Sequence, residues 1–141
     1  MGFAAERKLI ESTFDNDWLN GAYVHVPVRY ENIEFIPPAN NEPWVDFSIG
    51  SSDADAASLS ARIVRHEGEV TVDIYVPQGE GTNEARELAD EVSRILRNRQ
   101  ISSVEAGYIT FGEPDVAPMG AEEPYYKLQV TVDYERDEHT S

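Results

Sequence analysis

Two glycines, Gly79 and Gly81, are the residues whose spacing most suggests chemistry. They stand between an alternating apolar run and an amphipathic run, as the first glycines of a dinucleotide-binding turn do. The third glycine position of that motif is occupied by Glu84, and Glu80 and Glu87 lie beside it. Helix N-termini attract phosphates through free N–H groups and the helix dipole, and these carboxylates would cancel that attraction. We therefore interpret the stretch as a turn that leads into a helix, and we predict no cofactor.

Histidines, acids and serines form no recognisable reactive group. His25, His66 and His139 are scattered, and none has a neighbour at metal-ligand or acid–base spacing. The stretch Asp53-Ala54-Asp55 offers too few oxygens for Ca²⁺, which prefers six or more. The serines lack a Gly-x-Ser-x-Gly context, and the chain has no cysteine for thiolate chemistry or disulfides. The sequence predicts no catalytic residues and no metal ligands, and thus a protein that is not an enzyme.

The acidic composition restricts the partners that we expect. The chain has 27 Asp and Glu against 11 Lys and Arg, a formal net charge of -16 at pH 7. Such a surface repels nucleic-acid phosphates and anionic membranes over about 8–10 Å. We therefore expect no sequence-specific binding of nucleic acid and no membrane partner. The 141 residues contain no apolar run of membrane-spanning length and begin without a secretion-signal pattern, so we expect a soluble, unanchored protein.

Hydrophobic periodicity predicts two helices and six strands. Residues 2–18 and the run that follows Thr82 or Asn83, as N-cap, have apolar residues at helical spacing. Alternating apolar residues indicate the strands, and Glu67-Gly68 is interpreted as the turn of a hairpin. The polar stretch Ser51 to Ser58 is predicted to be a loop. The predicted strands are 22–28, 43–50, 59–66, 69–76, 106–113 and 125–135.

The predicted order α-β-β-β-β-α-β-β favours an α+β fold. Hairpins and alternation indicate a mostly antiparallel sheet with one solvated face, and two helices packed on the other face. No linker divides the chain, so residues 1–135 are predicted to form a single domain. Residues 136–141, RDEHTS, are predicted to be a flexible acidic C-terminal tail.

The connection between Val28 and Gly50 is aromatic and stiffened by prolines, and it allows two interpretations. Its large side chains could tuck under the sheet as a satellite of the core. Alternatively, they could form an exposed docking surface, because stiff segments lose little entropy on binding and aromatic residues are favoured at interfaces. The candidate protein-interface residues are Tyr30, Phe35, Ile36, Pro37, Pro38, Trp44 and Tyr75.

The same connection carries a resemblance to a known family. It contains a Pro-Val-x-Tyr-x-Asn-x-x-Phe-x-Pro-Pro run before Trp-Val, and a glycine-rich turn precedes an Ala/Leu-patterned helix over Gly79 to Leu96. The pattern resembles the tail terminator (minor tail) proteins of long-tailed bacteriophages, and the resemblance spans nearly the whole chain. The matching residues of the first run are Pro27, Val28, Tyr30, Asn32, Phe35, Pro37, Pro38, Trp44 and Val45.

The resemblance implies a structural role in the virion. Members of the family form a ring, usually a hexamer, that caps the finished tail tube, stops tube polymerisation and provides the surface for head attachment. The implied partners are copies of the chain itself, the tail tube protein and a head–tail connector protein, with DNA passing through the lumen. The implied location is the head-proximal end of the virion tail, after assembly in the host cytoplasm.

Two other functions remain open from the sequence. A head–tail joining or tail completion protein is a close neighbour of the first hypothesis. A small acidic inhibitor or immunity-type protein, which neutralises a basic partner by charge mimicry, belongs to a different class and is favoured by the net charge of -16. An inhibitor should be a monomer or dimer, whereas a terminator should form rings.

Overall fold

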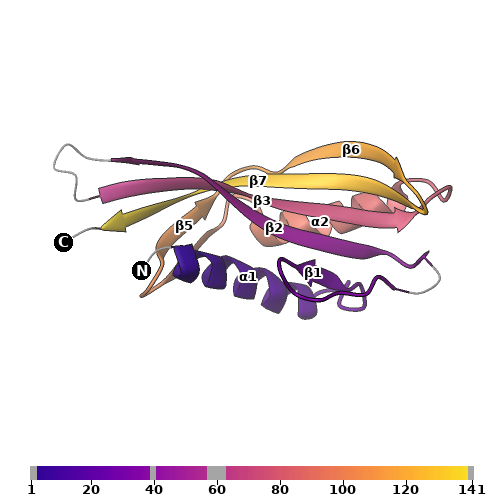
Figure 1. Ribbon diagram of the computed structural model, residues 1–141, viewed down its shortest axis with the longest axis horizontal. Coiled ribbons are helices and arrows are strands. Elements are labelled where there is room, and N and C mark those ends of the chain that lie inside the picture. Colours follow the sequence, from indigo (N-terminus) through magenta and orange to yellow (C-terminus); the bar gives the residue numbers. More distant parts are fainter. Residues whose placement is uncertain (1–2, 39–40, 57–62, 140–141) are drawn as a thin grey trace.

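The computed structural model describes residues 3–38, 41–56 and 63–139. This part of the chain contains two helices and seven strands (Figure 1). In chain order they are α1 (Phe3–Leu19), β1 (Val28–Tyr30), β2 (Trp44–Ala56), β3 (Ile63–Pro77), α2 (Asn83–Leu96), β4 (Gln100–Ser103), β5 (Gly107–Phe111), β6 (Asp115–Glu122) and β7 (Tyr125–His139).

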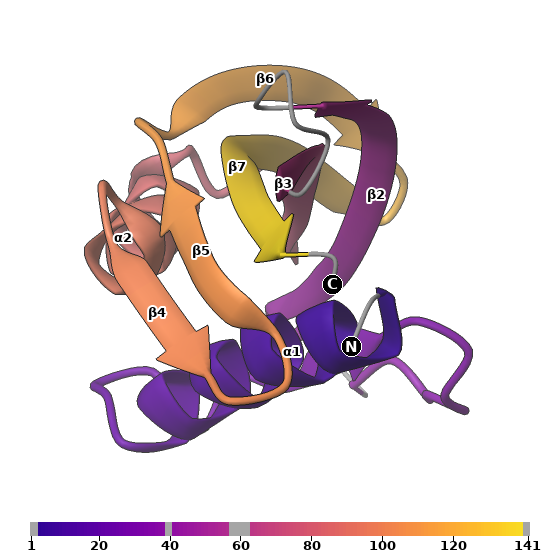
Figure 2. The ribbon, with the colours of Figure 1, turned by 90° about the vertical axis from the view of Figure 1, so that its left-hand side faces the viewer.

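The strands form one sheet in the order β1-β2-β3-β7-β5-β4, and β6 also pairs with β7. Every pairing is antiparallel except that of β1 with β2. On the side away from β3, β7 holds β6 along its first half and β5 along its second half. The long strands twist, so the sheet is curled rather than flat (Figure 2).

The α+β class, the single domain and the mostly antiparallel sheet agree with the sequence prediction. The observed order, however, is α-β-β-β-α-β-β-β-β, with three strands before α2 and four after it. The predicted packing of both helices on one face is not confirmed. α2 lies against β3 and β7, whereas α1 contacts α2 and β4, at another part of the curl (Figure 2).

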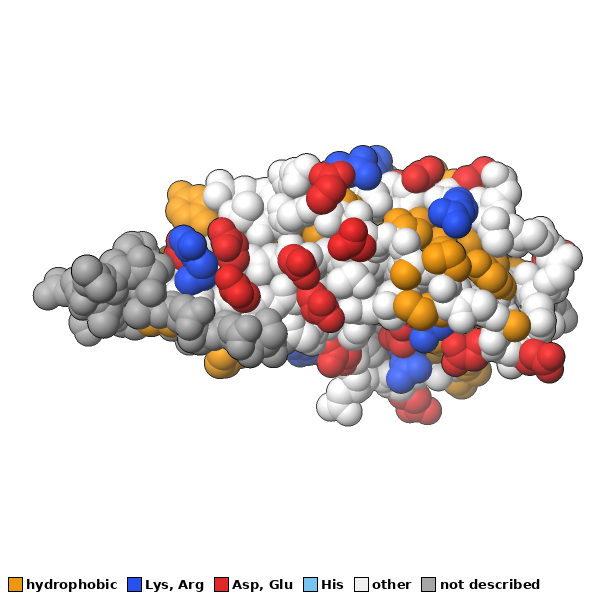
Figure 3. Space-filling view, turned by 90° about the horizontal axis from the view of Figure 1, so that it is seen from above, with side chains coloured by type: hydrophobic (Ala, Val, Ile, Leu, Met, Phe, Trp, Pro, Cys, Tyr) orange, Lys and Arg blue, Asp and Glu red, His pale blue; other side chains and the backbone are white. Residues whose placement is uncertain are grey.

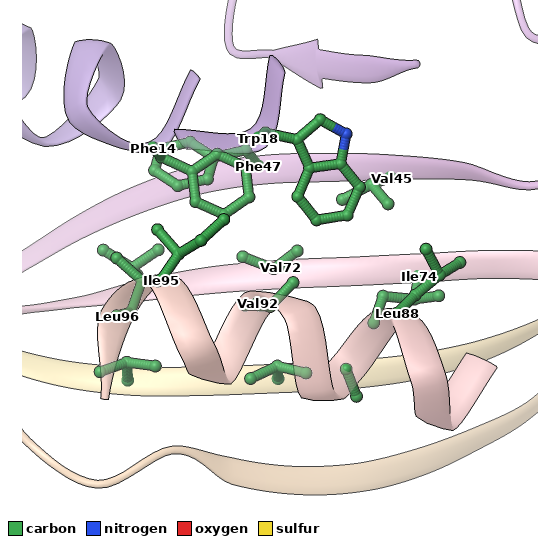
Figure 4. Close-up of a cluster of buried hydrophobic side chains, with 14 of the residues drawn as sticks. Phe14, Trp18, Val45, Phe47, Val72, Ile74, Leu88, Val92, Ile95 and Leu96 are labelled. Atoms are coloured by element: carbon green, nitrogen blue, oxygen red, sulfur yellow. The ribbon is translucent and has the colours of Figure 1, made fainter. Parts of the chain in front are cut away.

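The core lies between the helices and the inner side of the curled sheet. In α1 the buried residues Ile10, Phe14 and Trp18 recur every four positions, which places them on one face of the helix. The Phe14 ring lies 4.7 Å from the ring of Phe47 in β2, and Trp18 lies near Val45 (Figure 4). The Trp18 indole N–H donates to the backbone carbonyl of residue 26 at 3.0 Å, so its polar atom is satisfied.

α2 forms where its pattern predicts, and its apolar stripe is buried against the sheet (Figure 4). Thr82 occupies the N-cap position but makes no side-chain cap hydrogen bond, so packing rather than capping stabilises this end. Neither helix of the described ranges is long and apolar enough to cross a membrane. The buried apolar residues of the stripe are Ala85, Leu88, Ala89, Val92, Ile95 and Leu96.

The predicted hairpin turn at Glu67-Gly68 is wrong, because β3 runs unbroken from Ile63 to Pro77. Its antiparallel partner on one side is β2, which continues through residues 51–56 of the predicted loop. Residues 57–58 of that loop lie outside the described ranges. Gly68 lies opposite Tyr134 of β7, and a Cβ atom at this position would clash with the Tyr134 ring, so only glycine fits here.

One other strand prediction needs correction, and two of the observed strands were not predicted. Of the predicted strand 22–28, only Val28 is in a strand, because residues 22–25 form turns and β1 begins at Val28. The predicted strand 106–113 corresponds to β5, and β4 precedes it as an unpredicted hairpin partner. β6 was also missed, since Pro118 and Gly120 suggest a loop. The register shift between them marks an edge strand with an irregularity, where both residues are tolerated.

β7 continues to His139, so residues 136–139 of the predicted tail extend a strand. Arg136 in this stretch is only 1% exposed. The outermost residues, 140–141, lie outside the described ranges.

Candidate functional site

The residues first considered for chemistry do not come together. Gly79 and Gly81 have φ angles of 88° and 80° in the exposed turn before α2, which follows an antiparallel strand. His25 is exposed in the turns after α1, whereas His66 is half-buried in β3 against Phe3. No cluster of three metal-ligating side chains occurs among the described residues. The side chains of Asp53, Asp55 and His139 lie outside the description.

A shallow depression of about 440 Å³ lies on the sheet between β3, β5 and β7. Its carboxylates come from Glu67, Asp133 and Glu135, and the Arg65 guanidinium pairs with Glu135 at 3.9 Å. Its lining includes no histidine, cysteine or lysine, and it combines acids with backbone, two aromatic rings and the Thr110 hydroxyl. The remaining lining residues are Gly68, Thr110, Phe111, Gly112 and Tyr134.

A second apolar cluster lies on the sheet face that is turned away from the main core. Trp44 of β2 and Tyr75 of β3 are register partners, and their rings stack at 4.2 Å with an interplanar angle of 9°. Tyr125 of β7 meets both rings edge-on, at 6.3 and 6.0 Å. Their neighbours in the strands, such as Val45 and Ile74, face the main core, because side chains alternate along a strand.

The aromatic cluster is covered by the connection that precedes β2. The Phe35 ring packs against Trp44 at 5.1 Å, and the three rings beneath it are 7 to 9% exposed. The Trp44 indole N–H has no hydrogen-bond partner among the described residues, a destabilising feature that the stack must offset. Burial, as the largest cause, raises the pKa of Tyr75 above its ordinary value. Phe35, Trp44 and Tyr75 thus form a satellite of the core.

The connection itself is anchored at Glu31 and Phe35, and two of its apolar side chains are exposed. The Glu31 carboxylate accepts a hydrogen bond from the backbone N–H of Ile49 at 2.6 Å, and Phe35 anchors the segment to the cluster. Between and beyond these anchors, Ile33 is 55% exposed and Ile36 is 83% exposed. We call residues 31–38 the apolar arm.

The seven predicted interface residues therefore divide into buried and exposed members. Tyr30 supports β1, since its hydroxyl donates to Asp15 at 2.7 Å and its ring lies 5.5 Å from Phe47. Burial and the Asp15 carboxylate raise the pKa of that phenol. Ile36 and Pro37 are exposed on the apolar arm, and Pro38 is half-buried. The structure brings Phe35, Trp44 and Tyr75 together, as described above.

Sequence reasoning missed one surface, the flank of β6. Val116 and Met119 of this strand are 40% and 48% exposed. Figure 3 views the molecule from the β6 side, and hydrophobic side chains gather on its right half, where β6 runs in Figure 1. Acidic side chains lie across the middle of the same view. The only signal in the sequence was a stretch of small apolar residues between two strands, which does not distinguish a loop from an exposed strand.

The comparisons with known proteins decide the family. Residues 4–134 match the family model described as phage tail terminator protein. The chain belongs to the phage tail terminator family. This confirms the resemblance noted in the sequence over nearly the whole chain. The terminator family is one of structural proteins of the phage tail, so this chain is a component of a phage virion that interacts with other tail and head proteins.

A solved structure shows that the terminator fold recurs at low sequence identity. It superimposes with a TM-score of 0.71 at 19% identity, and the match covers 96% of this terminator and 98% of the other chain. At this identity the likeness shows the fold alone. No curated protein matches the terminator in sequence.

Proposed function

We propose that this terminator forms a ring, a hexamer by analogy with its family, at the head-proximal end of the tail tube. The ring stops further addition of tube protein and provides the surface to which the head attaches. The single observation that carries the proposal is the family match over residues 4–134. The folded unit extends past residue 135, because β7 continues to His139 and Arg136 is buried. The proposed partners are further copies, the tail tube protein and a head–tail connector protein.

The surface features support a role in protein contacts. The apolar arm presents Ile36 and Pro37 to solvent, and the β6 flank presents a second apolar surface. The excess of carboxylates gives a ring whose lumen repels DNA phosphates, so DNA would pass through without sticking. Assembly of such a ring takes place in the host cytoplasm, before the head joins the tail.

Tube growth in vitro tests the function. The tail tube protein of the same phage is polymerised with and without the purified terminator, and tube ends and lengths are recorded by electron microscopy. We expect rings on the tube ends and no further growth when more tube protein is added. Tubes that keep growing with bare ends would contradict the terminator role. Rings that bind the head connector but not the tube would favour a head–tail joining protein instead.

A further inference from the structure

The charge of the chain restricts how two copies can meet. Each copy carries a formal net charge of -16, so polar surfaces of two copies repel one another. Most described cations already pair with acids of their own chain, which leaves few to bridge carboxylates on a neighbour. A contact between copies therefore has to use apolar surface. The paired cations are Arg7, Arg29, Arg65, Arg94, Arg97, Arg99, Lys127 and Arg136.

The flank of β6 is one apolar surface at an edge of the sheet. β6 pairs with β7 on one side, and no strand within the described ranges pairs with its other side. Val116 and Met119 of this strand are exposed. Pro118 and the register shift after it hinder a second strand from pairing along the whole edge. Side chains, rather than a continuous backbone ladder, must therefore dominate any contact.

The apolar arm lies at the opposite edge. It follows β1, and β2, β3 and β7 separate β1 from β6 in the sheet. Figure 1 shows β6 along the upper margin of the molecule and β1 along the lower margin. The arm holds Ile33 and Ile36 in solvent, because Phe35 and Glu31 fix its backbone to β2. A prepositioned apolar side chain loses little entropy on binding, which suits it to be inserted into a neighbour.

We propose that Ile33 and Ile36 of one copy pack against Val116 and Met119 on the β6 flank of the next copy. Two different surfaces meet in this contact, so it is heterologous and joins copies head to tail. Repetition of a heterologous contact closes into a ring when the rotation between copies permits it. The inference deepens the proposed ring function, on which it rests, by naming the two surfaces that join the subunits.

Cysteine crosslinking tests the contact directly, because the chain has no cysteine of its own. Ile36→Cys and Met119→Cys variants are mixed, oxidised and separated without reducing agent. We expect a linked dimer that contains one copy of each variant. Val104 is 99% exposed in the β4–β5 turn, so Val104→Cys mixed with Ile36→Cys is the matched control. Thiols held together react at a raised effective concentration, so linkage should exceed the control by about tenfold or more.

Introducing a charge into either surface tests whether the contact joins the arm of one copy to the β6 flank of the next. Ile36→Asp disables the arm and Met119→Asp disables the flank, and each variant alone should remain monomeric in light scattering. Mixed together, they should form dimers and nothing larger, since each pair retains one intact arm and one intact flank. Both positions are exposed, so thermal unfolding should match that of the parent protein. Larger assemblies from either variant alone would overturn the proposal.

The outcomes separate this contact from the ring function. If the parent caps tube ends but the cysteine pair links no better than the Val104 control, in solution and on tubes, the contact is wrong and the function stands. If the pair links but the linked assemblies leave tube growth unchanged, the contact is right and the terminator role fails. Linkage between two Ile36→Cys copies in place of the mixed pair would show an isologous contact and would also overturn the proposal.

Discussion

Glu6 and Arg136 lie 130 positions apart in the chain and form an ion pair that is closed to solvent. The Arg136 Nε–H donates to one carboxylate oxygen of Glu6 at 2.9 Å, and the Tyr134 hydroxyl donates to the other at 2.8 Å. Glu6 is 2% exposed and Arg136 is 1% exposed. Burying two charges is tolerated only when each finds partners, so this pair ties the first turn of α1 to the last part of β7.

Replacing Arg136 with Met should therefore destabilise the protein strongly. The change leaves the Glu6 carboxylate buried without its cation, a loss of about 3–5 kcal/mol in the free energy of unfolding. The double variant Glu6→Met/Arg136→Met should recover most of that loss, because it removes both charges. Urea unfolding measures all three proteins.

An exposed ion pair provides the control for that prediction. Arg97 and Glu113 pair at 2.9 Å with side chains 56% and 62% exposed. Arg97→Met should lower the free energy of unfolding by about 1 kcal/mol or less, as is usual for exposed pairs. Equal losses for Arg97→Met and Arg136→Met would show that burial does not strengthen the inner pair.

The role of Arg136 shows where sequence reasoning reaches its limit. The helix α2 and the strand β7 as far as Tyr134 were predictable, because their apolar residues repeat at periods that depend on neighbouring positions alone. RDEHTS has no apolar period, so it was interpreted as a tail. The burial of Arg136 depends on Glu6 at the other end of the chain, and no local pattern records that contact.

Gly68 gives a second prediction, since Gly68→Ala should destabilise the sheet. A Cβ atom there would come within 2.6 Å of the Tyr134 ring and 2.7 Å of the Gly50 carbonyl oxygen. Tyr134 cannot move freely, because it is buried and its hydroxyl is bonded to Glu6. We expect a loss of about 1–3 kcal/mol, the usual range for overpacking a core.

Gly50→Ala is the matched control in the neighbouring strand. The nearest atom to its added Cβ is the Cγ of Glu69, at 3.9 Å, which is an ordinary contact. Thermal unfolding of the two alanine variants should therefore separate clearly, with Gly50→Ala close to the parent protein. A Gly68→Ala protein as stable as Gly50→Ala would mean that the ring of Tyr134 can shift at little cost.

The same glycine explains why the sheet was predicted only in part. A glycine between two alternating runs suggests a hairpin turn, and the alternative, a strand glycine beneath a distant tyrosine, requires knowledge of the strand pairing. The candidate interface shows a similar limit. The aromatic connection was recognisable, but its division into half-buried Phe35 and exposed Ile36 depends on the Trp44–Tyr75 stack across two strands. The β6 flank was missed because Pro118 and Gly120 suggest a loop, and only the pairing with β7 shows a strand there.

That division predicts effects of different size on stability for two neighbouring substitutions in the apolar arm. Phe35→Ala removes the ring that packs on Trp44 and should lower the free energy of unfolding by about 1–3 kcal/mol, given that the ring is only half-buried. Ile36→Ala changes a side chain that is 83% exposed and should stay within about 0.5 kcal/mol of the parent. Urea unfolding of the monomer, at low protein concentration, measures both. Equal losses would show that Ile36 also packs on the fold.

Asp46 provides a prediction that depends on pH. Its strand partner across the sheet is Asp73, and Arg29 pairs with Asp46 at 4.0 Å. Burial, as the largest cause, raises the pKa of Asp46 in the folded protein; Asp73 raises it further, whereas Arg29 opposes the shift. Because the folded pKa exceeds the unfolded one, Asp46 favours folding at low pH, and this contribution is lost as the pH rises through the folded pKa.

Asp46→Asn should therefore stabilise the folded protein at pH 7. The gain in the free energy of unfolding should be about 0.5 kcal/mol or less, because solvent screens a partly exposed carboxylate. The gain should shrink as the pH falls through the raised pKa of folded Asp46, and it should disappear below about 4, where Asp46 is protonated in both states. Urea unfolding of the parent protein and of Asp46→Asn over this range of pH measures the gain. If Asp46→Asn instead destabilises the protein at pH 7, the attraction to Arg29 outweighs burial and the repulsion from Asp73, and the direction of the shift is wrong.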